Sequence, residues 1–165
     1  MEPEALLQHI PKSCKNVHIW GTGLSRLPSL LSGRGNLNYI LATDTSLFAI
    51  LAMKASSCTS KDTTKYAVTR SKKSIAAGLT ASFDCIVEKG TLAAIPAHNQ
   101  ASAARVMLDQ LNGGGTLVSV WLEQSKPDAL TMLKEVGFVE IRVAKEVEVG
   151  SSKVIVLTGA KAQET

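Results

Sequence analysis

Apolar residues along the chain alternate between short continuous runs and segments in which they recur every three or four positions. Continuous runs that end at glycine or polar residues predict buried strands. These runs lie at 16–20, 37–42, 66–69, 83–87, 116–122, 138–143 and 153–158. Recurrence every three or four positions predicts helices, and it occurs at 3–10, 25–33, 46–53, 101–111 and 128–136. Residues 74–79 fit a helical turn or a loop.

The order of these elements predicts the fold class. Strands that alternate with helices form a parallel sheet covered by helices on both faces. The last two strands follow a single helix and are joined across residues 150–152, so they pair antiparallel. We therefore expect a three-layer α/β domain with a mostly parallel sheet and an antiparallel C-terminal strand. Because no linker or repeat interrupts the pattern, residues 1–160 form one domain and the polar residues 161–165 form a flexible tail.

Composition narrows the class of protein. The 165 residues are 45% hydrophobic and 4% aromatic, which suits one domain with an aliphatic core. No apolar run approaches the roughly 18 residues that a membrane span needs. The acidic start, Met1–Glu4, lacks the basic and then apolar layout of a signal peptide. We expect a cytoplasmic protein.

Cysteines and charges indicate no metal site and no nucleic-acid platform. Cys14, Cys58 and Cys85 are widely spaced and share no CxxC pattern, so neither a disulfide framework nor a metal site is predicted. The net charge is +4, and much of the excess lies in 61–73. This basic segment is either a patch for phosphate or an acidic protein partner, or a solvated loop. Aromatic residues are not interleaved with it, as single-strand RNA binding would require.

A glycine turn and an acidic residue predict a nucleotide site. The first predicted strand ends at Gly21 and Gly23, where the backbone is able to approach a ligand. Asp44 ends the second strand, which is the position of an acid that binds a ribose hydroxyl pair. The alternatives are a tight turn for the glycines and a helix N-cap for Asp44. Arg26 stands where a dinucleotide fingerprint has its third glycine, which disfavours a nicotinamide-dependent oxidoreductase.

Three stretches, Val17–Pro28, Ala42–Ser46 and Ser82–Leu92, resemble class I S-adenosylmethionine (SAM)-dependent methyltransferases. They are similar in particular to the branch that modifies lysines in elongation factor 1-alpha. That branch has a Gly-Cys-Gly-Asn-Ser first loop and an Asp-Lys-Gly-Thr-Leu motif after the fourth strand. The order of elements matches along nearly the whole chain, so the resemblance implies a Rossmann-like methyltransferase fold.

The resemblance also implies a set of cofactor-binding residues. Gly21, Gly23 and Ser25 would face the methionine part of SAM, and Asp44 would hold its ribose. Glu88 and the residues up to Thr91 would border the methyl-transfer site. Glu88 stands in place of the family's usual Asp and is longer by a methylene. No catalytic residue follows from the resemblance.

Two departures from the family pattern bear on function. Members of the family carry an acid after the third strand that accepts the adenine amino group, whereas residues 68–73 contain no Asp or Glu. They also have a segment before the first strand that caps the cofactor, and here the strand begins at Asn16. These departures imply that SAM is bound weakly or not at all.

A second resemblance is to the N-terminal domain of anamorsin, a cytosolic iron–sulfur cluster assembly factor with a trimmed methyltransferase fold. It rests on Leu133–Val139 and Val154–Lys161. Our first hypothesis is therefore a non-catalytic, monomeric interaction module with a protein partner and no nucleic acid or membrane. The alternative is an active SAM-dependent methyltransferase that acts on protein lysine, which Gly21, Gly23 and Asp44 favour.

The remaining polar candidates have structural interpretations as well. His18 alternates along a strand and is interpreted as a hydrogen-bonded structural residue rather than a base. His98 follows the Gly90–Leu92 motif, where it either accepts a proton or lies on the surface. Trp121, at the end of the fifth strand, lies beside an adenine or in the core, and we favour the core.

Overall fold

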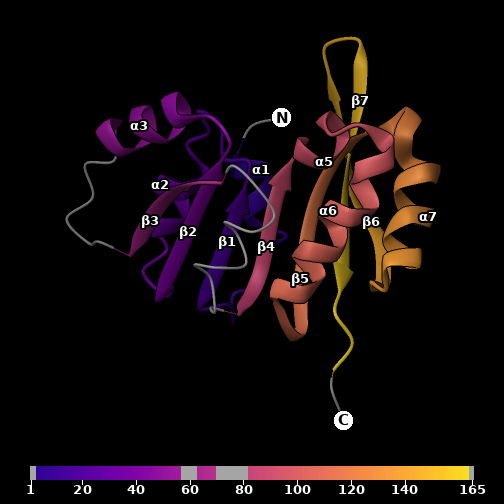
Figure 1. Cartoon of the computed structure of the whole chain (residues 1–165), viewed down its shortest axis with the longest axis horizontal. Coiled ribbons are helices and arrows are strands. Elements are labelled where there is room, and N and C mark those ends of the chain that lie inside the picture. The colour runs from indigo at the N-terminus through magenta and orange to yellow at the C-terminus, as the bar shows by residue number, and fades with distance from the viewer. Residues whose placement is uncertain (1–2, 57–62, 70–81, 164–165) are drawn as a thin grey trace.

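In the part of the chain that the structure describes, seven strands form one sheet, which helices cover on both faces (Figure 1). The computed structural model describes residues 3–56, 63–69 and 82–163. Its elements are α1 (Glu4–Leu7), β1 (Asn16–Trp20), α2 (Leu27–Ser32), β2 (Tyr39–Asp44), α3 (Leu47–Ser56), β3 (Thr64–Val68), β4 (Phe83–Lys89), α5 (Thr91–Ala94), α6 (Ala97–Gln110), β5 (Leu111–Leu122), η1 (Glu123–Ser125), α7 (Lys126–Val136), β6 (Val139–Val149) and β7 (Ser152–Ala160). The predicted segment 74–79 lies outside the described residues.

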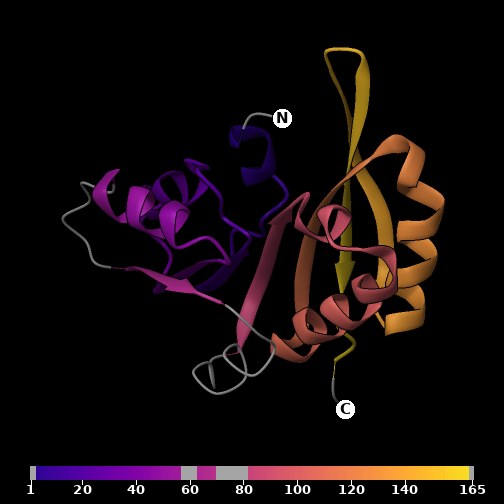
Figure 2. The same ribbon diagram turned by 45° about the horizontal axis from the view of Figure 1, so that its top comes forward.

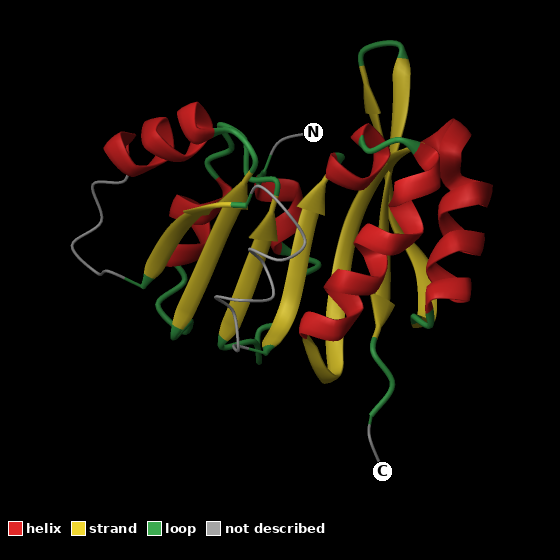
Figure 3. Ribbon diagram, viewed as in Figure 1, coloured by secondary structure: helices red, strands yellow, loops and turns green. Residues whose placement is uncertain are grey.

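The strand order is β3-β2-β1-β4-β5-β7-β6. Strands β1 to β5 run parallel to one another, whereas β7 inserts antiparallel between β5 and β6. Figure 3 shows the parallel strands with their carboxyl ends at one edge of the sheet. The predicted α/β class with its antiparallel C-terminal strand is thus confirmed.

Side chains of alternate strand residues belong to two separate apolar cores, one on each face of the sheet. One core joins strand residues such as Val17 and Val87 to α1 and α2. The other joins residues such as Ile86 and Leu117 to α6 and α7, which pack side by side (Figure 2). Trp121 is buried in this second core, where Nε1 donates to Ser119 Oγ at 2.6 Å. The core interpretation of Trp121 is confirmed.

The C-terminal strands are longer than the apolar runs that predicted them. β5 begins at Leu111 instead of 116, and its pairing with β4 shifts register across Gly113–Gly115. β6 continues to Val149 because it lies at the edge of the sheet, where charged and apolar residues alternate. An edge strand needs no continuous apolar run, so the prediction ended this strand too early.

The predicted tail begins with a residue that the fold holds in place. The Lys161 amide donates to Gly115 O and its carbonyl accepts from the Gly114 amide, both at 2.9 Å. Its Nζ donates to Leu111 O at 2.9 Å. The first residue of the predicted tail is thus hydrogen-bonded to the first part of β5 through its backbone and its side chain.

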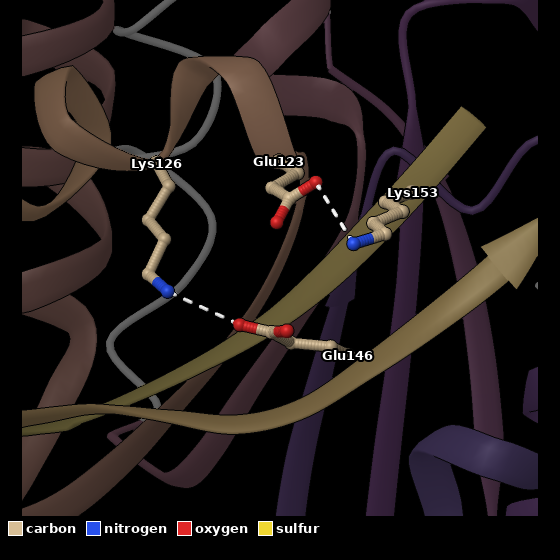
Figure 4. Close-up of polar contacts among 4 residues, drawn as sticks. All are labelled: Glu123, Lys126, Glu146 and Lys153. Carbon is tan, nitrogen blue, oxygen red and sulfur yellow. Dashed lines mark hydrogen bonds and ion pairs between the residues drawn. The ribbon is translucent and has the colours of Figure 1, made fainter.

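Two ion pairs join the hairpin of β6 and β7 to the connection between β5 and α7 (Figure 4). Lys126 Nζ lies 3.1 Å from Glu146 Oε1, and Lys153 Nζ lies 3.9 Å from Glu123 Oε2. All four side chains are partly exposed, so each pair contributes little to stability. Together they align the hairpin with the carboxyl end of β5.

His18 is a buried structural residue of β1, as its alternation in the strand predicts. Its ring nitrogens lie 3.0 Å from Gln110 Oε1 and 2.9 Å from Thr43 Oγ1. The ring packs against Phe83 at 5.0 Å between centroids. Burial lowers the pKa of His18 to about 4, although the hydrogen bond to Gln110 opposes this change. The imidazole is therefore neutral at physiological pH.

We expect acid to destabilise the fold through His18. In the unfolded chain a histidine protonates near pH 6.5, so stability is complete above that pH and is lost as the pH falls toward 4. The loss reaches about 3 kcal/mol at pH 4. Urea unfolding of the wild type and of His18→Gln between pH 7 and pH 4 measures how the free energy of unfolding depends on pH. The difference between the two proteins isolates the contribution of His18, because the other titrating groups are common to both. Identical slopes in the two proteins would contradict the assignment.

Candidate functional site

The structure brings the predicted cofactor residues to one edge of the sheet. β1, β2 and β4 are adjacent, and Trp20 pairs with Thr43 on one side and with Glu88 on the other. The loop that begins at Gly21 therefore lies between the carboxyl ends of β2 and β4. Ligands of doubly wound sheets bind at this edge.

The glycine loop has a left-handed backbone at both of its glycines. Gly21 has φ 68° and Gly23 has φ 54°. The Thr22 amide donates to Thr43 O at 2.9 Å, which fastens the loop to the end of β2. An ideal Cβ on Gly23 would have no atom within 4 Å, so the side of the loop at this residue is open.

Asp44 joins the glycine loop to the start of α3. Its Oδ2 accepts the Gly23 amide at 2.8 Å, and its Oδ1 accepts the Ser46 amide at 2.8 Å. Ser46 Oγ in turn accepts the Ala49 amide at 3.2 Å, so Ser46 rather than Asp44 caps α3. Each carboxylate oxygen of the half-buried Asp44 has capacity for a further hydrogen bond.

Ser25 completes the turn that leads into α2. Its amide donates to Thr22 O at 3.1 Å, and its Oγ accepts the Leu27 amide at 3.3 Å. The serine hydroxyl is therefore engaged with the backbone of the helix that follows. Its part in the site is to hold the loop.

Glu88 lies at the end of β4 but its side chain is buried beneath the site. Its Oε2 accepts the amides of Thr91 at 2.8 Å and Leu92 at 3.1 Å. Its Oε1 accepts the Ser119 hydroxyl and, at 3.2 Å, the Val120 amide. Burial raises the pKa of Glu88, and these four hydrogen bonds oppose that change. The carboxylate thereby ties α5 and β5 to the end of β4.

Two residues of this network do not stand out in the sequence as partners. The Thr91 side chain lies on the backbone of Gly21 and donates from Oγ1 to Trp20 O at 3.1 Å. Ser119 is fully buried near the carboxyl end of β5, where its hydroxyl donates to Glu88. The signal for Ser119 is its position as a polar residue inside the apolar run 116–122.

Other candidates from the sequence lie apart from this edge or on the surface. His98 is exposed on α6, where its Nε2 lies 3.0 Å from Asn99 Nδ2. Cys85 is buried in β4 with a free thiol, and Cys14 is likewise free and buried. Among the described residues, no group of three or more metal-binding side chains is close enough to hold an ion. No helix in the described part of the chain is long and apolar enough to cross a membrane.

Among the comparisons with known proteins, the one with solved structures finds similar proteins. No protein family and no curated protein matches the sequence. Among solved structures, a SAM-dependent methyltransferase from Methanosarcina mazei superposes with a TM-score of 0.76 at 15% identity, over 99% of this chain and 100% of that one. The N-methyltransferase NodS from Bradyrhizobium japonicum WM9 gives 0.74 at 16% identity, over 98% and 94%.

A third similar structure contains the cofactor. It is magnesium protoporphyrin IX methyltransferase from Synechocystis PCC 6803 with bound SAM, with a TM-score of 0.70 at 13% identity, over 88% of this chain and 69% of that one. This chain therefore has the Rossmann-like fold of SAM-dependent methyltransferases.

The contact between Gly21 and Thr91 predicts that Gly21 tolerates no side chain. A Cβ at Gly21 would lie 2.0 Å from Thr91 Oγ1, in a backbone conformation that already disfavours side chains. We expect Gly21→Ala to lower the free energy of unfolding by about 3 kcal/mol, of which 1–2 come from the left-handed backbone. Gly35→Ala is the matched control, because Gly35 has φ +72° and nothing within 4 Å. Equal losses in urea unfolding would refute the role of Thr91.

The four hydrogen bonds to Glu88 predict that the fold needs acceptors at both of its side-chain oxygens. In Glu88→Gln the side-chain NH₂ group would lie where one carboxylate oxygen now accepts hydrogen bonds. Its N–H groups would therefore face other donors. We expect a loss of about 2–4 kcal/mol in the free energy of unfolding at pH 7. Glu135→Gln, on the exposed face of α7, is the control and is expected to change stability by less than about 0.5 kcal/mol. A Glu88→Gln protein as stable as the wild type would disprove the network.

Proposed function

We propose that this chain binds SAM at the carboxyl edge of its sheet and transfers the methyl group to an acceptor. The observation that carries the proposal is the pair of hydrogen bonds from the Gly23 and Ser46 amides to Asp44. They fix an open glycine loop beside a carboxylate that retains capacity for the two ribose hydroxyls. The similar structure with bound SAM supports this choice of ligand.

The residues at this edge fit the chemical groups of the cofactor. The space beside Gly23 is the place a side chain would fill, so the backbone is exposed there to an approaching ligand. Asp44 would accept hydrogen bonds from the ribose. When bound, SAM supplies a methyl group on a positively charged sulfur. Transfer of such a group depends mainly on alignment of the acceptor, so the site needs no side chain that acts as a base.

Protein lysine is the acceptor that we propose for this activity. The support is the resemblance of Glu88–Leu92 to the motif of the branch that modifies elongation factor 1-alpha. The second candidate is a non-catalytic interaction module of the anamorsin type. One observation favours it: Glu88, at the position of that motif's acid, has both of its oxygens committed to Thr91, Leu92, Ser119 and Val120.

Calorimetric titration with SAM and S-adenosylhomocysteine tests the proposed site. We expect Asp44→Ala to weaken SAM binding by about 2 kcal/mol, or roughly thirtyfold, because a charged hydrogen-bond acceptor is lost. Asp84→Ala is the matched control at the opposite edge of the sheet. Asp84 accepts hydrogen bonds from Lys15 N at 2.8 Å, Asn16 N at 3.0 Å and Asn112 Nδ2 at 2.8 Å. Asp84→Ala loses a comparable set of hydrogen bonds away from the proposed site, so its SAM affinity should not change.

Absence of SAM binding at millimolar concentration would overturn the proposed site and leave the interaction module. If SAM binds, incubation with methyl-tritiated SAM and lysine-containing protein fractions tests transfer. Methyl-lysine in the acid hydrolysate that depends on Asp44 supports the enzyme. Tight binding without label in protein would exclude the lysine acceptor.

A further inference from the structure

Thr91 contacts the glycine loop from the side of β4, whereas Asp44 contacts it from the side of β2. Thr91 is the first residue of α5, which lies at the carboxyl end of β4 (Figure 1). Its Oγ1 donates to Trp20 O at 3.1 Å, and this carbonyl belongs to the peptide bond that leads into Gly21. The hydroxyl therefore fixes the peptide at which β1 ends and the loop begins.

Both branches of the Thr91 side chain lie against Gly21. The place of a Cβ on Gly21 is 2.0 Å from Thr91 Oγ1 and 2.7 Å from Thr91 Cγ2. A β-branched side chain has little freedom about χ1, so the hydroxyl and the methyl group keep these positions together. Thr91 thus fills the space that a side chain on Gly21 would need, beside a backbone with φ 68°.

A buried carboxylate holds Thr91 itself in place. The Thr91 amide donates to Glu88 Oε2 at 2.8 Å. Glu88 is fully buried, and its other oxygen accepts the Val120 amide of β5 at 3.2 Å. The next residue, Leu92, is buried in the core that α6 and α7 share. Thr91 is therefore fixed relative to both β4 and β5.

The glycine loop is thereby held from both of its neighbouring strands. On the side of β2, the Thr22 amide donates to Thr43 O at 2.9 Å. The Gly23 amide donates to Asp44 Oδ2 at 2.8 Å. On the side of β4, Thr91 binds the carbonyl at which the loop begins. A backbone that is already fixed loses little conformational freedom when a ligand binds to it, so these contacts favour binding.

We propose that Thr91 is a positioning residue for SAM, which acts through the glycine loop and does not itself touch the cofactor. Its hydroxyl and its methyl group hold the backbone of Gly21–Gly23 in the conformation that receives the ligand. Supporting residues of this kind matter because a binding site must be held within about 0.5 Å of its productive geometry. The inference rests on the proposed function, since it requires that SAM binds at this loop.

Thr91→Val tests the hydroxyl, because valine keeps the branched shape and removes the donor. We expect it to weaken SAM binding roughly fivefold in calorimetric titration, as for one lost hydrogen bond between neutral groups. Thr91→Ser keeps the hydroxyl and should bind SAM within about twofold of the wild type. Thr158→Val is the matched control, because Thr158 Oγ1 accepts a hydrogen bond from Arg142 Nε at 3.4 Å on β7, away from the loop. Its SAM affinity should not change.

Amide hydrogen exchange measures the position of the loop without SAM. In Thr91→Val we expect the Thr22 and Gly23 amides to exchange at least about fivefold faster, because the loop opens more easily. The amides of Lys15 and Asn16 are hydrogen-bonded at the start of β1 and serve as the internal reference. Their exchange should not change, and Thr91→Ser should restore slow exchange in the loop. Circular dichroism establishes that each variant is folded.

Four results would overturn the proposal. Unchanged loop exchange in Thr91→Val shows that the hydroxyl does not hold the loop. Equally faster exchange at Lys15 and Asn16 assigns Thr91 to the stability of the whole domain. A wild type that binds SAM, with equal binding by Thr91→Val, refutes the positioning role alone. A wild type that binds no SAM refutes the proposed function and the positioning role together.

Discussion

The Asp44 carboxylate is the junction on which this edge of the molecule depends. It accepts one amide from the glycine loop and one from the turn before α3. These two hydrogen bonds join segments that are otherwise separate surface loops. Because a single rigid strand, β2, presents this carboxylate, the loop and the helix keep a fixed position relative to each other. The candidate cofactor site depends on this fixed position.

Two further carboxylates act in the same way elsewhere in the sheet. Asp84 ties the start of β1 to β4, and Glu88 ties the end of β4 to α5 and β5. Burial acts to raise the pKa of both acids. For Asp84 the hydrogen bonds from Lys15 N, Asn16 N and the Asn112 side chain together outweigh burial and lower the pKa, whereas for Glu88 burial prevails and raises it. β4 therefore carries an acid at each end, and each acid accepts main-chain donors that lie outside the regular ladder.

The sequence predicted those parts of the fold that a local pattern determines. The strand 16–20 was predicted to the residue, because a buried parallel strand is a continuous apolar run. The meeting of Gly21, Gly23 and Asp44 was predictable as well, since adjacent parallel strands end at the same edge. The roles of Glu88 and Lys161 were not predictable from the sequence. Their partners lie far away in sequence, at Ser119 and at Gly114, and register alone decides whether they meet.

The edge strand β6 has a consequence for how the chain associates. It pairs only with β7 within the described part of the chain, so one side of its backbone is unpaired. Its register shifts twice, near Glu140, whose φ is 53°, and again before Lys145. Bulges and charged side chains of this kind prevent a foreign strand from adding to a sheet. The chain is thereby protected against amyloid-like stacking at this edge.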